Sequence, residues 1–201
     1  MLPVSKTFGP DVVRAALALG LHRFGENKVQ EIRDKAAALA GETIDWVVIG
    51  HLQTNKAKDV ARLASEVQSL DRLELAEALH RRLEIEGRRI DVLVQVKTAR
   101  EETKQGLAEA ALPDFLKALR AYPTLRVQGL MTLATLSTDA QEVLACFRRL
   151  RELRDRCAAD GHPLPRLSMG MSGDFPLAIA EGATEIRIGT AIFGSRSYPG
   201  V

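Results

Sequence analysis

The sequence predicts an α/β fold, a single (β/α)8 TIM-type barrel that spans residues 1–201. Short apolar runs alternate with longer amphipathic segments along the chain, which is typical of parallel strands joined by helices. There are eight such strand–helix units, the number that closes a barrel, and no Ser/Pro-rich linker or shift in composition divides them. An open doubly wound sheet is the competing fold, but no GxGxxG pattern follows the first strand-like run.

The predicted strands are short and rich in β-branched and other apolar residues. Two of them, DWVVIG and DVLVQVK, are apolar at most positions, as expected for strands that are covered on both faces. In chain order, the strands are expected at Leu2–Ser5, His22–Gly25, Asp45–Gly50, Glu66–Leu70, Asp91–Lys97, Leu125–Thr132, Arg166–Met169 and Glu185–Gly189.

Helices are predicted between these strands, from apolar residues that recur every three or four positions. The two clearest apolar stripes are Val29, Ile32, Ala36 and Leu39, and then Val143, Phe147, Leu150, Leu153 and Cys157. Cys146 and Cys157 lie on the second stripe, and their spacing suits neither a zinc knuckle nor a redox CxxC motif. We therefore expect two buried thiols in a reducing compartment.

The composition excludes several classes of function. The net charge is +2, acids and bases are interspersed, and aromatic residues make up 4%, so we expect no nucleic-acid partner. No charged-then-apolar leader and no apolar run long enough to cross a bilayer is present, which predicts a cytoplasmic protein without a membrane partner. A compact anion such as phosphate remains allowed, because it needs only a local pocket.

Ligands of parallel barrels bind at the C-terminal ends of the strands, where the βα loops gather. The polar residues at these predicted ends are therefore the candidates for a site. They are Ser5-Lys6-Thr7, Gly25-Glu26-Asn27, His51 with Gln53 and Asn55, Asp71-Arg72, Lys97-Thr98, Met131-Thr132, Met171-Ser172-Gly173, and Arg187 with Gly189-Thr190.

Two of these groups suit a phosphate. Barrels commonly bind phosphate on the loops after their seventh and eighth strands, where backbone N–H groups point outward. The groups Met171–Gly173 and Gly189–Thr190 follow those strands, and each pairs a hydroxyl with a glycine that lets backbone approach an anion closely. In the alternative interpretation, Ser172 or Asp174 only caps the next short helix, and Gly189 only ends a strand.

Two cationic residues face a choice between a site and a structural role. Lys6 ends the first strand. It is either a solvated charge or, over the barrel mouth, an amine whose pKa is lowered by desolvation and nearby cations, ready to attack an aldehyde. Arg187 lies two residues before Gly189, on the same side of the strand, and needs an anion or acceptor. Its alternative is an internal ion pair with Glu26 or Asp71.

Other polar residues have simpler explanations. Asn27 stands three residues before Gln30, an arrangement that caps a helix, with ligand contact as an additional role. Thr54 has the same pattern. His51 is a lone histidine without a second ligand at metal spacing, so no metal is expected. No Ser/His/Asp order indicates a hydrolase.

Motifs along almost the whole chain resemble those of the pyridoxal phosphate homeostasis proteins, the YggS/PROSC family. They are PVSKT (Pro3–Thr7), FGENKVQE (Phe24–Glu31), IGHLQTNK (Ile49–Lys56), SLDR (Ser69–Arg72), GLMTL (Gly129–Leu133), LSMGMSGDF (Leu167–Phe175) and EIRIGTAIFGSR (Glu185–Arg196). The resemblance implies a barrel like the alanine racemase N-terminal domain. It also implies that this barrel binds pyridoxal 5'-phosphate (PLP) without a second domain.

The resemblance also implies the roles of individual residues. Lys6 would carry PLP as a Schiff base, and Arg187 would face the pyridine nitrogen. Asn27 and Met171 would line the pocket. Ser172, Gly189 and Thr190 would hold the phosphate.

Two features depart from the family's pattern. Family members usually have a helical segment before the first strand, whereas this sequence begins almost directly with Leu2–Ser5, as a short natural form or a clipped one. Pro3 replaces the usual alanine and withholds one ladder hydrogen bond, so we expect local adjustment without a change of function.

The implied place of Arg187 argues against catalysis. Arginine stays protonated, so it discourages protonation of the pyridine nitrogen and makes the ring a weaker electron sink. Racemisation also needs acid–base groups on both faces of the substrate, and alanine racemase supplies the second from a tyrosine across a subunit interface. Only Tyr122 and Tyr198 are present here, and neither lies in a motif that matches this role.

We therefore expect a non-catalytic PLP carrier or buffer, a monomer or weak dimer that passes PLP to apo-enzymes that depend on it. One alternative is a PLP-dependent amino-acid racemase that acts through Lys6. Another is a Schiff-base aldolase that uses Lys6 without a cofactor.

Overall fold

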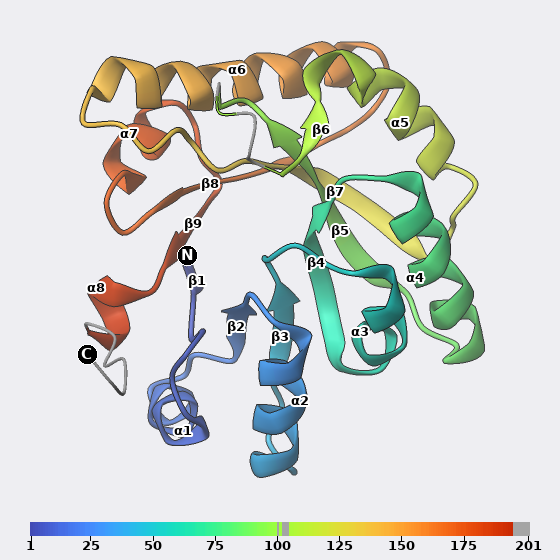
Figure 1. The fold of residues 1–201 in the computed structure, drawn as a ribbon, viewed down its shortest axis with the longest axis vertical. Helices are drawn as coiled ribbons and strands as arrows, with labels where there is room; N and C mark the ends of the chain where they lie inside the picture. The colour runs from blue at the N-terminus through green and yellow to red at the C-terminus, as the bar shows by residue number, and fades with distance from the viewer. Residues whose placement is uncertain (100, 102–104, 195–201) are drawn as a thin grey trace.

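Eight parallel strands form a nearly closed barrel with helices around its outside (Figure 1). The computed structural model describes residues 1–99, 101 and 105–194. All eight predicted strands are confirmed, with ends that shift by a few residues. They are β1 (Leu2–Pro3), β2 (Arg23–Glu26), β3 (Asp45–Val48), β4 (Ala64–Leu70), β5 (Ile90–Lys97), β7 (Leu125–Met131), β8 (Arg166–Met171) and β9 (Glu185–Ile188).

The strands follow one another around the barrel in the order β1-β9-β8-β7-β5-β4-β3-β2, and every pair is parallel. The ring closes between β1 and β2 through an isolated parallel bridge of Val4 with Gly25. There the Ser5 amide donates to the Gly25 carbonyl over 3.1 Å. Because all strands run in the same direction, their C-terminal ends meet at one edge of the barrel.

Pro3 is accommodated within β1 by its register. It lies opposite Ile188 of β9, and the next amide, that of Val4, donates to the Ile188 carbonyl over 2.8 Å. The missing N–H of Pro3 therefore leaves the neighbouring ladder bond intact.

One short strand was not predicted from the sequence. β6 (Leu107–Ala108) pairs in parallel with the end of β5, where Leu107 lies opposite Val96. It comprises two residues outside the ring, too short for alternation of polar and apolar residues to reveal.

The helices lie outside the strands (Figure 1), and those from α1 to α7 bury apolar residues in the core. Their bounds are α1 (Pro10–Ala18), α2 (Val29–Ala38), α3 (Ala57–Leu63), α4 (Leu73–Ile85), α5 (Leu112–Leu119), α6 (Ala140–Ala159), α7 (Phe175–Ala180) and α8 (Thr190–Phe193). Two 3-10 turns, Thr54–Lys56 and Glu109–Ala111, precede α3 and α5. The stripe predicted in α6 is buried, and Cys146 and Cys157 are free, buried thiols. None of the described helices is long and apolar enough to span a bilayer.

The N-terminal half of the barrel interior holds a network of charged side chains. Glu66 accepts from Arg23 over 2.7 Å and from Arg166 over 2.9 Å, and Glu185 also bonds to both arginines. Burial alone would raise the pKa of Glu185, but the hydrogen bond and charge of Arg23, with Arg166, lower it overall. The network therefore fills the barrel beneath the C-terminal edge with paired charges.

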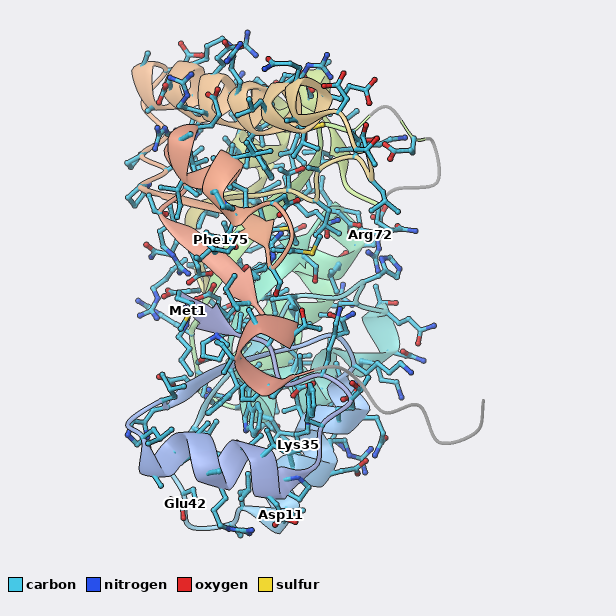
Figure 2. All side chains as sticks on the ribbon, turned by 90° about the vertical axis from the view of Figure 1, so that its left-hand side faces the viewer. Met1, Asp11, Lys35, Glu42, Arg72 and Phe175 are labelled. Carbon is cyan, nitrogen blue, oxygen red and sulfur yellow. The ribbon has the colours of Figure 1, made fainter. Side chains whose placement is uncertain are left out.

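Figure 2 shows how the side chains divide between the interior and the surface. Lys35 lies on the side of α2 that faces the barrel and is 4% exposed, whereas Asp11 and Glu42 lie at the outer edge. A lysine buried to this degree requires charged or hydrogen-bonding partners.

Candidate functional site

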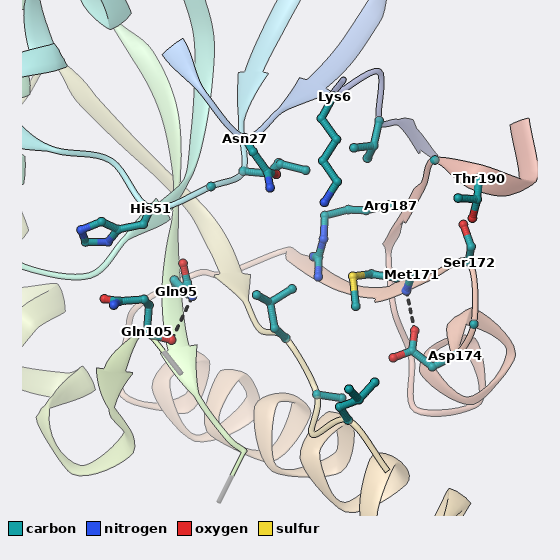
Figure 3. A pocket seen from close by; sticks show the side chains of 18 of the residues that line it. Lys6, Asn27, His51, Gln95, Gln105, Met171, Ser172, Asp174, Arg187 and Thr190 are labelled. Atoms are coloured by element: carbon teal, nitrogen blue, oxygen red, sulfur yellow. Dashed lines mark hydrogen bonds between the residues drawn. The ribbon is translucent and has the colours of Figure 1, made fainter. Parts of the chain in front are cut away.

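A pocket of about 550 Å3 opens at the C-terminal edge of the barrel (Figure 3). This volume is within the range of small-molecule and cofactor sites. All seven residues predicted for the site line it: Lys6, Asn27, Met171, Ser172, Arg187, Gly189 and Thr190. The structure therefore brings together residues that come from both ends of the sequence.

Lys6 lies on the turn that follows β1 and points into the pocket toward Arg187 (Figure 3). The turn is closed by the Phe8 amide, which donates to the Ser5 carbonyl over 3.1 Å. Its third residue, Thr7, has φ 71°, a left-handed conformation that is costly for a β-branched residue. Lys6 is thus presented by a tight turn in an unusual backbone conformation.

Arg187 is 3% exposed and lies in the middle of the pocket (Figure 3). Its guanidinium donates to Ser168 Oγ over 2.8 Å and to the Thr132 carbonyl over 2.7 Å. Burial lowers the pKa of Arg187 to about 10, so the side chain is still a cation at neutral pH. Its two hydrogen bonds go to neutral oxygens, which leaves the charge available to a bound ligand.

The ion pair suggested as an alternative for Arg187 is not formed. Glu26 pairs instead with Lys35 over 2.5 Å. Asp71 pairs with Arg72 over 2.6 Å, and its other oxygen lies 3.8 Å from His51 Nδ1. The carboxylates considered as partners are therefore occupied by other cations.

The loops after β8 and β9 place hydroxyl groups and glycines together. In Figure 3, Ser172 and Thr190 lie side by side at one end of the pocket. The loop after β8 folds back on itself, because Asp174 Oδ1 accepts from the Met171 amide over 2.5 Å. Asp174 thus holds this loop and makes no side-chain cap bond to α7, contrary to the capping alternative.

Gly170 allows the loop after β8 to pack closely. It has φ 91°, and a Cβ there would lie 2.6 Å from Ala178 Cβ. Since neither the conformation nor the space admits a side chain, glycine is required at this position. The sequence signalled the glycines of the loops themselves but not this one, which lies within the strand.

The capping roles expected for Asn27 and Thr54 are wrong. The helix α2 begins at Val29, and its N-cap residue is Lys28. The N-cap residue of the 3-10 turn before α3 is Gln53. Neither N-cap residue makes a side-chain hydrogen bond to its helix or turn. Asn27 instead lines the pocket, and its backbone packs against Gly50, where a Cβ would lie 2.4 Å from the Asn27 carbonyl oxygen.

Of three further lining residues, His51 was among the candidates at the predicted strand ends, whereas Gln95 and Gln105 were not predicted. His51, Gln95 and Gln105 lie at the end of the pocket away from Ser172 (Figure 3). Gln95 Nε2 donates to the Gln105 carbonyl over 2.9 Å. Alternation along β5 could have indicated Gln95, whereas Gln105 carries no such signal. The remaining lining residues are Val4, Ile49, Gly50, Leu133, Ala134, Thr135, Leu136, Gly173 and Asp174.

The geometry defines a class of ligand. An amine and a buried guanidinium face the centre of the pocket, hydroxyl groups and loop glycines lie at one end, and apolar side chains form much of the wall. Such a set suits a small ligand that carries a carbonyl group and a phosphate. The site thus has the position and the polar groups found in TIM-type barrels that bind a small phosphorylated molecule at the C-terminal edge.

The comparisons with known proteins identify the family. Residues 1–197 match the family described as "Alanine racemase, N-terminal domain". The chain is 42% identical over 199 residues to the "Pyridoxal phosphate homeostasis protein" of Aquifex aeolicus. The match covers 98% of this chain and 87% of the Aquifex protein. This chain belongs to the family of the alanine racemase N-terminal domain.

Solved structures agree with this placement. The structure of PipY from Synechococcus elongatus PCC7942 with PLP bound has a TM-score of 0.88 and 38% identity, and the match covers 96% of this chain and 91% of PipY. PipY without PLP gives a TM-score of 0.91, covering 96% and 92%. An alanine racemase of Clostridium difficile 630 shares the fold alone, with 14% identity, a TM-score of 0.79 and coverage of 99% of this chain but 52% of the racemase.

Proposed function

We propose that this protein binds PLP and acts as a carrier or buffer in intracellular PLP homeostasis. The observation that carries the proposal is the convergence of Lys6, Arg187 and the two hydroxyl–glycine loops on one pocket. The printed name of the Aquifex relative and the PLP bound to PipY support the same conclusion. We place this function in the cytoplasm, with apo-enzymes that require PLP as the recipients.

The pocket residues fit PLP at its aldehyde and at its phosphate. When bound, PLP supplies an aldehyde, whose carbon an amine can attack to form a C=N bond while the oxygen leaves as water. Lys6 supplies that amine and so holds the cofactor as a Schiff base. Ser172, Gly189 and Thr190 bind the phosphate through hydroxyl and backbone N–H donors.

Arg187 orients the ring and limits its chemistry. Ser168 Oγ and the Thr132 carbonyl fix the orientation of its guanidinium, which would donate to the pyridine nitrogen of bound PLP. A protonated arginine at this atom opposes protonation of the ring, which weakens its capacity to accept electrons. The proposed role is therefore binding, with little or no turnover.

A racemase is the second candidate, because the pocket is lined by acid–base groups besides Lys6, namely His51 and Asp174. His51 lies at the end away from Ser172, with its side chain 44% exposed and Nδ1 3.8 Å from Asp71. Tyr122 lies elsewhere: it packs against His80, beside a groove formed by α5 and Pro163. Tyr198 falls outside the described residues. Among the described residues that line the pocket, His51 is the candidate for the second group, since Asp174 already accepts a hydrogen bond from the Met171 amide.

Borohydride reduction followed by peptide mass spectrometry tests the proposal. The protein saturated with PLP should be yellow, and reduction should place one phosphopyridoxyl group on Lys6 and none on Lys28, an exposed lysine nearby. Lys6→Ala should lose the adduct and keep its fold. A colourless protein, or an adduct on another lysine, would contradict the binding mode. Alanine racemisation at ordinary enzymatic rates that is lost in Lys6→Ala and His51→Ala would favour the racemase.

A further inference from the structure

A buried cluster lies directly behind the turn that carries Lys6. It comprises Ser5, Glu26 and Lys35, of which none is more than 4% exposed. Lys35 Nζ donates to the Ser5 carbonyl over 2.8 Å and to Glu26 Oε1 over 2.5 Å. Ser5 Oγ donates to the same carboxylate oxygen over 2.6 Å. The residue before Lys6 is thus fixed through both its carbonyl and its side chain.

The residue after Lys6 is held by a side chain of α2, the helix that also carries Lys35. The Thr7 amide donates to Glu31 Oε2 over 2.6 Å, and that oxygen also lies 3.6 Å from Lys35 Nζ. Lys35 and Glu31 are one turn apart on α2, so a single helix face reaches both sides of the turn. This contact satisfies the amide of the residue with φ 71°.

The strained backbone of Thr7 indicates that these contacts hold the turn in its conformation. A β-branched residue in the left-handed region is strained and persists only where its surroundings hold it. Burying a lysine–glutamate pair is a weak source of stability, since desolvation offsets the attraction of the charges. A requirement to hold one backbone conformation explains both features.

We propose that Lys35, Glu26 and Glu31 are positioning residues that clamp the Ser5–Thr7 backbone and thereby aim the Lys6 amine into the pocket. The inference rests on the proposed role of Lys6 and adds the means by which α2 controls it. No member of the clamp lines the pocket, so the clamp acts through the backbone.

The clamp contains a group that titrates near neutral pH. Burial raises the pKa of Glu26 to about 7, although Lys35 and Ser5 oppose the shift; Glu31 adds to it. One of its oxygens, Oε2, is buried without a hydrogen-bond partner among the described residues. Protonation of Glu26 removes the charge that Lys35 faces, so the hold on Ser5 should change as pH crosses this value.

Amide hydrogen exchange in the PLP-free protein tests the clamp without relying on the cofactor. Glu31→Ala, at a partly exposed position, should raise the exchange rate of the Thr7 amide at least about tenfold, whereas Glu31→Gln, which keeps an acceptor oxygen, should restore slow exchange. Asp34→Ala, an exposed acid on the same helix, should leave the rate unchanged. Equal Thr7 rates in the wild type and Glu31→Ala would overturn the proposal.

Lys35→Met should have the same effect on the turn, with Lys28→Met, at the exposed residue that precedes α2, as its control. If the buried Glu26 left behind prevents folding, the double variant Lys35→Met/Glu26→Gln removes both charges and should fold. Its Thr7 amide should still exchange faster than in the wild type. A wild-type rate in the folded double variant would also overturn the proposal.

The pH dependence separates positioning from simple stability. The amide signals of Lys6 and Thr7 should titrate near pH 7 in the wild type and not in Glu26→Gln. Borohydride trapping is measured in parallel: if Lys6 forms no adduct even in the wild type, the proposed function fails while the clamp stands. If Lys6 is trapped but Thr7 responds to none of these substitutions, the clamp fails and the proposed function stands.

Discussion

Arg187 Nη1 donates a hydrogen bond to Ser168 Oγ over 2.8 Å, which links adjacent strands β9 and β8 inside the barrel. Ser168 Oγ in turn donates to Gln68 Oε1 over 2.7 Å, and Gln68 bonds to Glu66 and Glu185 of the charged network. The guanidinium in the pocket is therefore oriented by a continuous chain of hydrogen bonds that reaches the N-terminal half of the barrel.

Arg187→Lys should weaken the site while keeping its charge. A lysine cannot donate in the planar geometry that serves Ser168 and the Thr132 carbonyl at once, so at least one buried bond is lost. The free energy of unfolding of the PLP-free protein should fall by about 1–3 kcal/mol, measured by urea denaturation. Arg120→Lys, an exposed substitution on the surface, should change it little. Unchanged stability in Arg187→Lys would show that the chain of bonds does not constrain the guanidinium.

Ser172→Ala and Thr190→Val should weaken PLP binding through its phosphate. Each removes one hydroxyl from the end of the pocket assigned to the phosphate, and a hydrogen bond to a charged group contributes about 1.5–3 kcal/mol. The Kd for PLP should therefore rise at least about tenfold for each variant, whereas the Kd for pyridoxal, which lacks the phosphate, should stay nearly constant.

Fluorescence titration with both ligands distinguishes this effect from general damage. Thr43→Val is the matched control, because Thr43 is exposed in the loop that precedes β3, at the opposite edge of the barrel. An equal loss of affinity for PLP and pyridoxal would place the phosphate elsewhere.

Gly170→Ala should disrupt the loop that carries Ser172. The new Cβ would lie 2.6 Å from Ala178 Cβ, in addition to the strain at φ 91°. Gly41→Ala introduces similar strain at φ 98° with no atom within 4 Å, so the difference between the two variants isolates the steric clash. Gly41→Ala should cost about 1 kcal/mol and leave PLP affinity intact, while Gly170→Ala should cost several kcal/mol and lower that affinity. Thermal unfolding and PLP titration give both quantities; similar losses in the two variants would contradict the packing argument.

The sequence could predict the barrel, and the edge of it at which polar residues from distant segments meet, for physical reasons; the particular set of seven site residues was implied by the family resemblance. Strand periodicity and the shared direction of parallel strands determine which residues meet at the C-terminal edge, so Lys6 and Thr190 come together although they are far apart in the chain. Side-chain partners are less predictable, since they depend on packing angles. Asn27 has the spacing of a helix cap, yet α2 starts at Val29. Lys35 is one of several charged residues in its helix, and its residue type does not indicate that it is buried. The strain at Thr7 also has no signal in residue type.

Glu185→Gln should make the protein less stable at neutral pH and less sensitive to acid. The pKa of Glu185 lies below its usual value of 4.5, because Arg23 and Arg166 outweigh the opposing effect of burial. A carboxyl with a lowered pKa in the folded state stabilises the fold above its unfolded pKa, and that contribution is lost as pH falls through the folded value. Replacing Glu185 leaves Glu66 as the one carboxylate of the network that pairs with Arg23 and Arg166, so the free energy of unfolding should fall at pH 7. Urea denaturation of wild type and variant from pH 7 to pH 3 should show the two stabilities converging below about pH 4.5; a constant difference over this range would mean that Glu185 does not titrate with the fold.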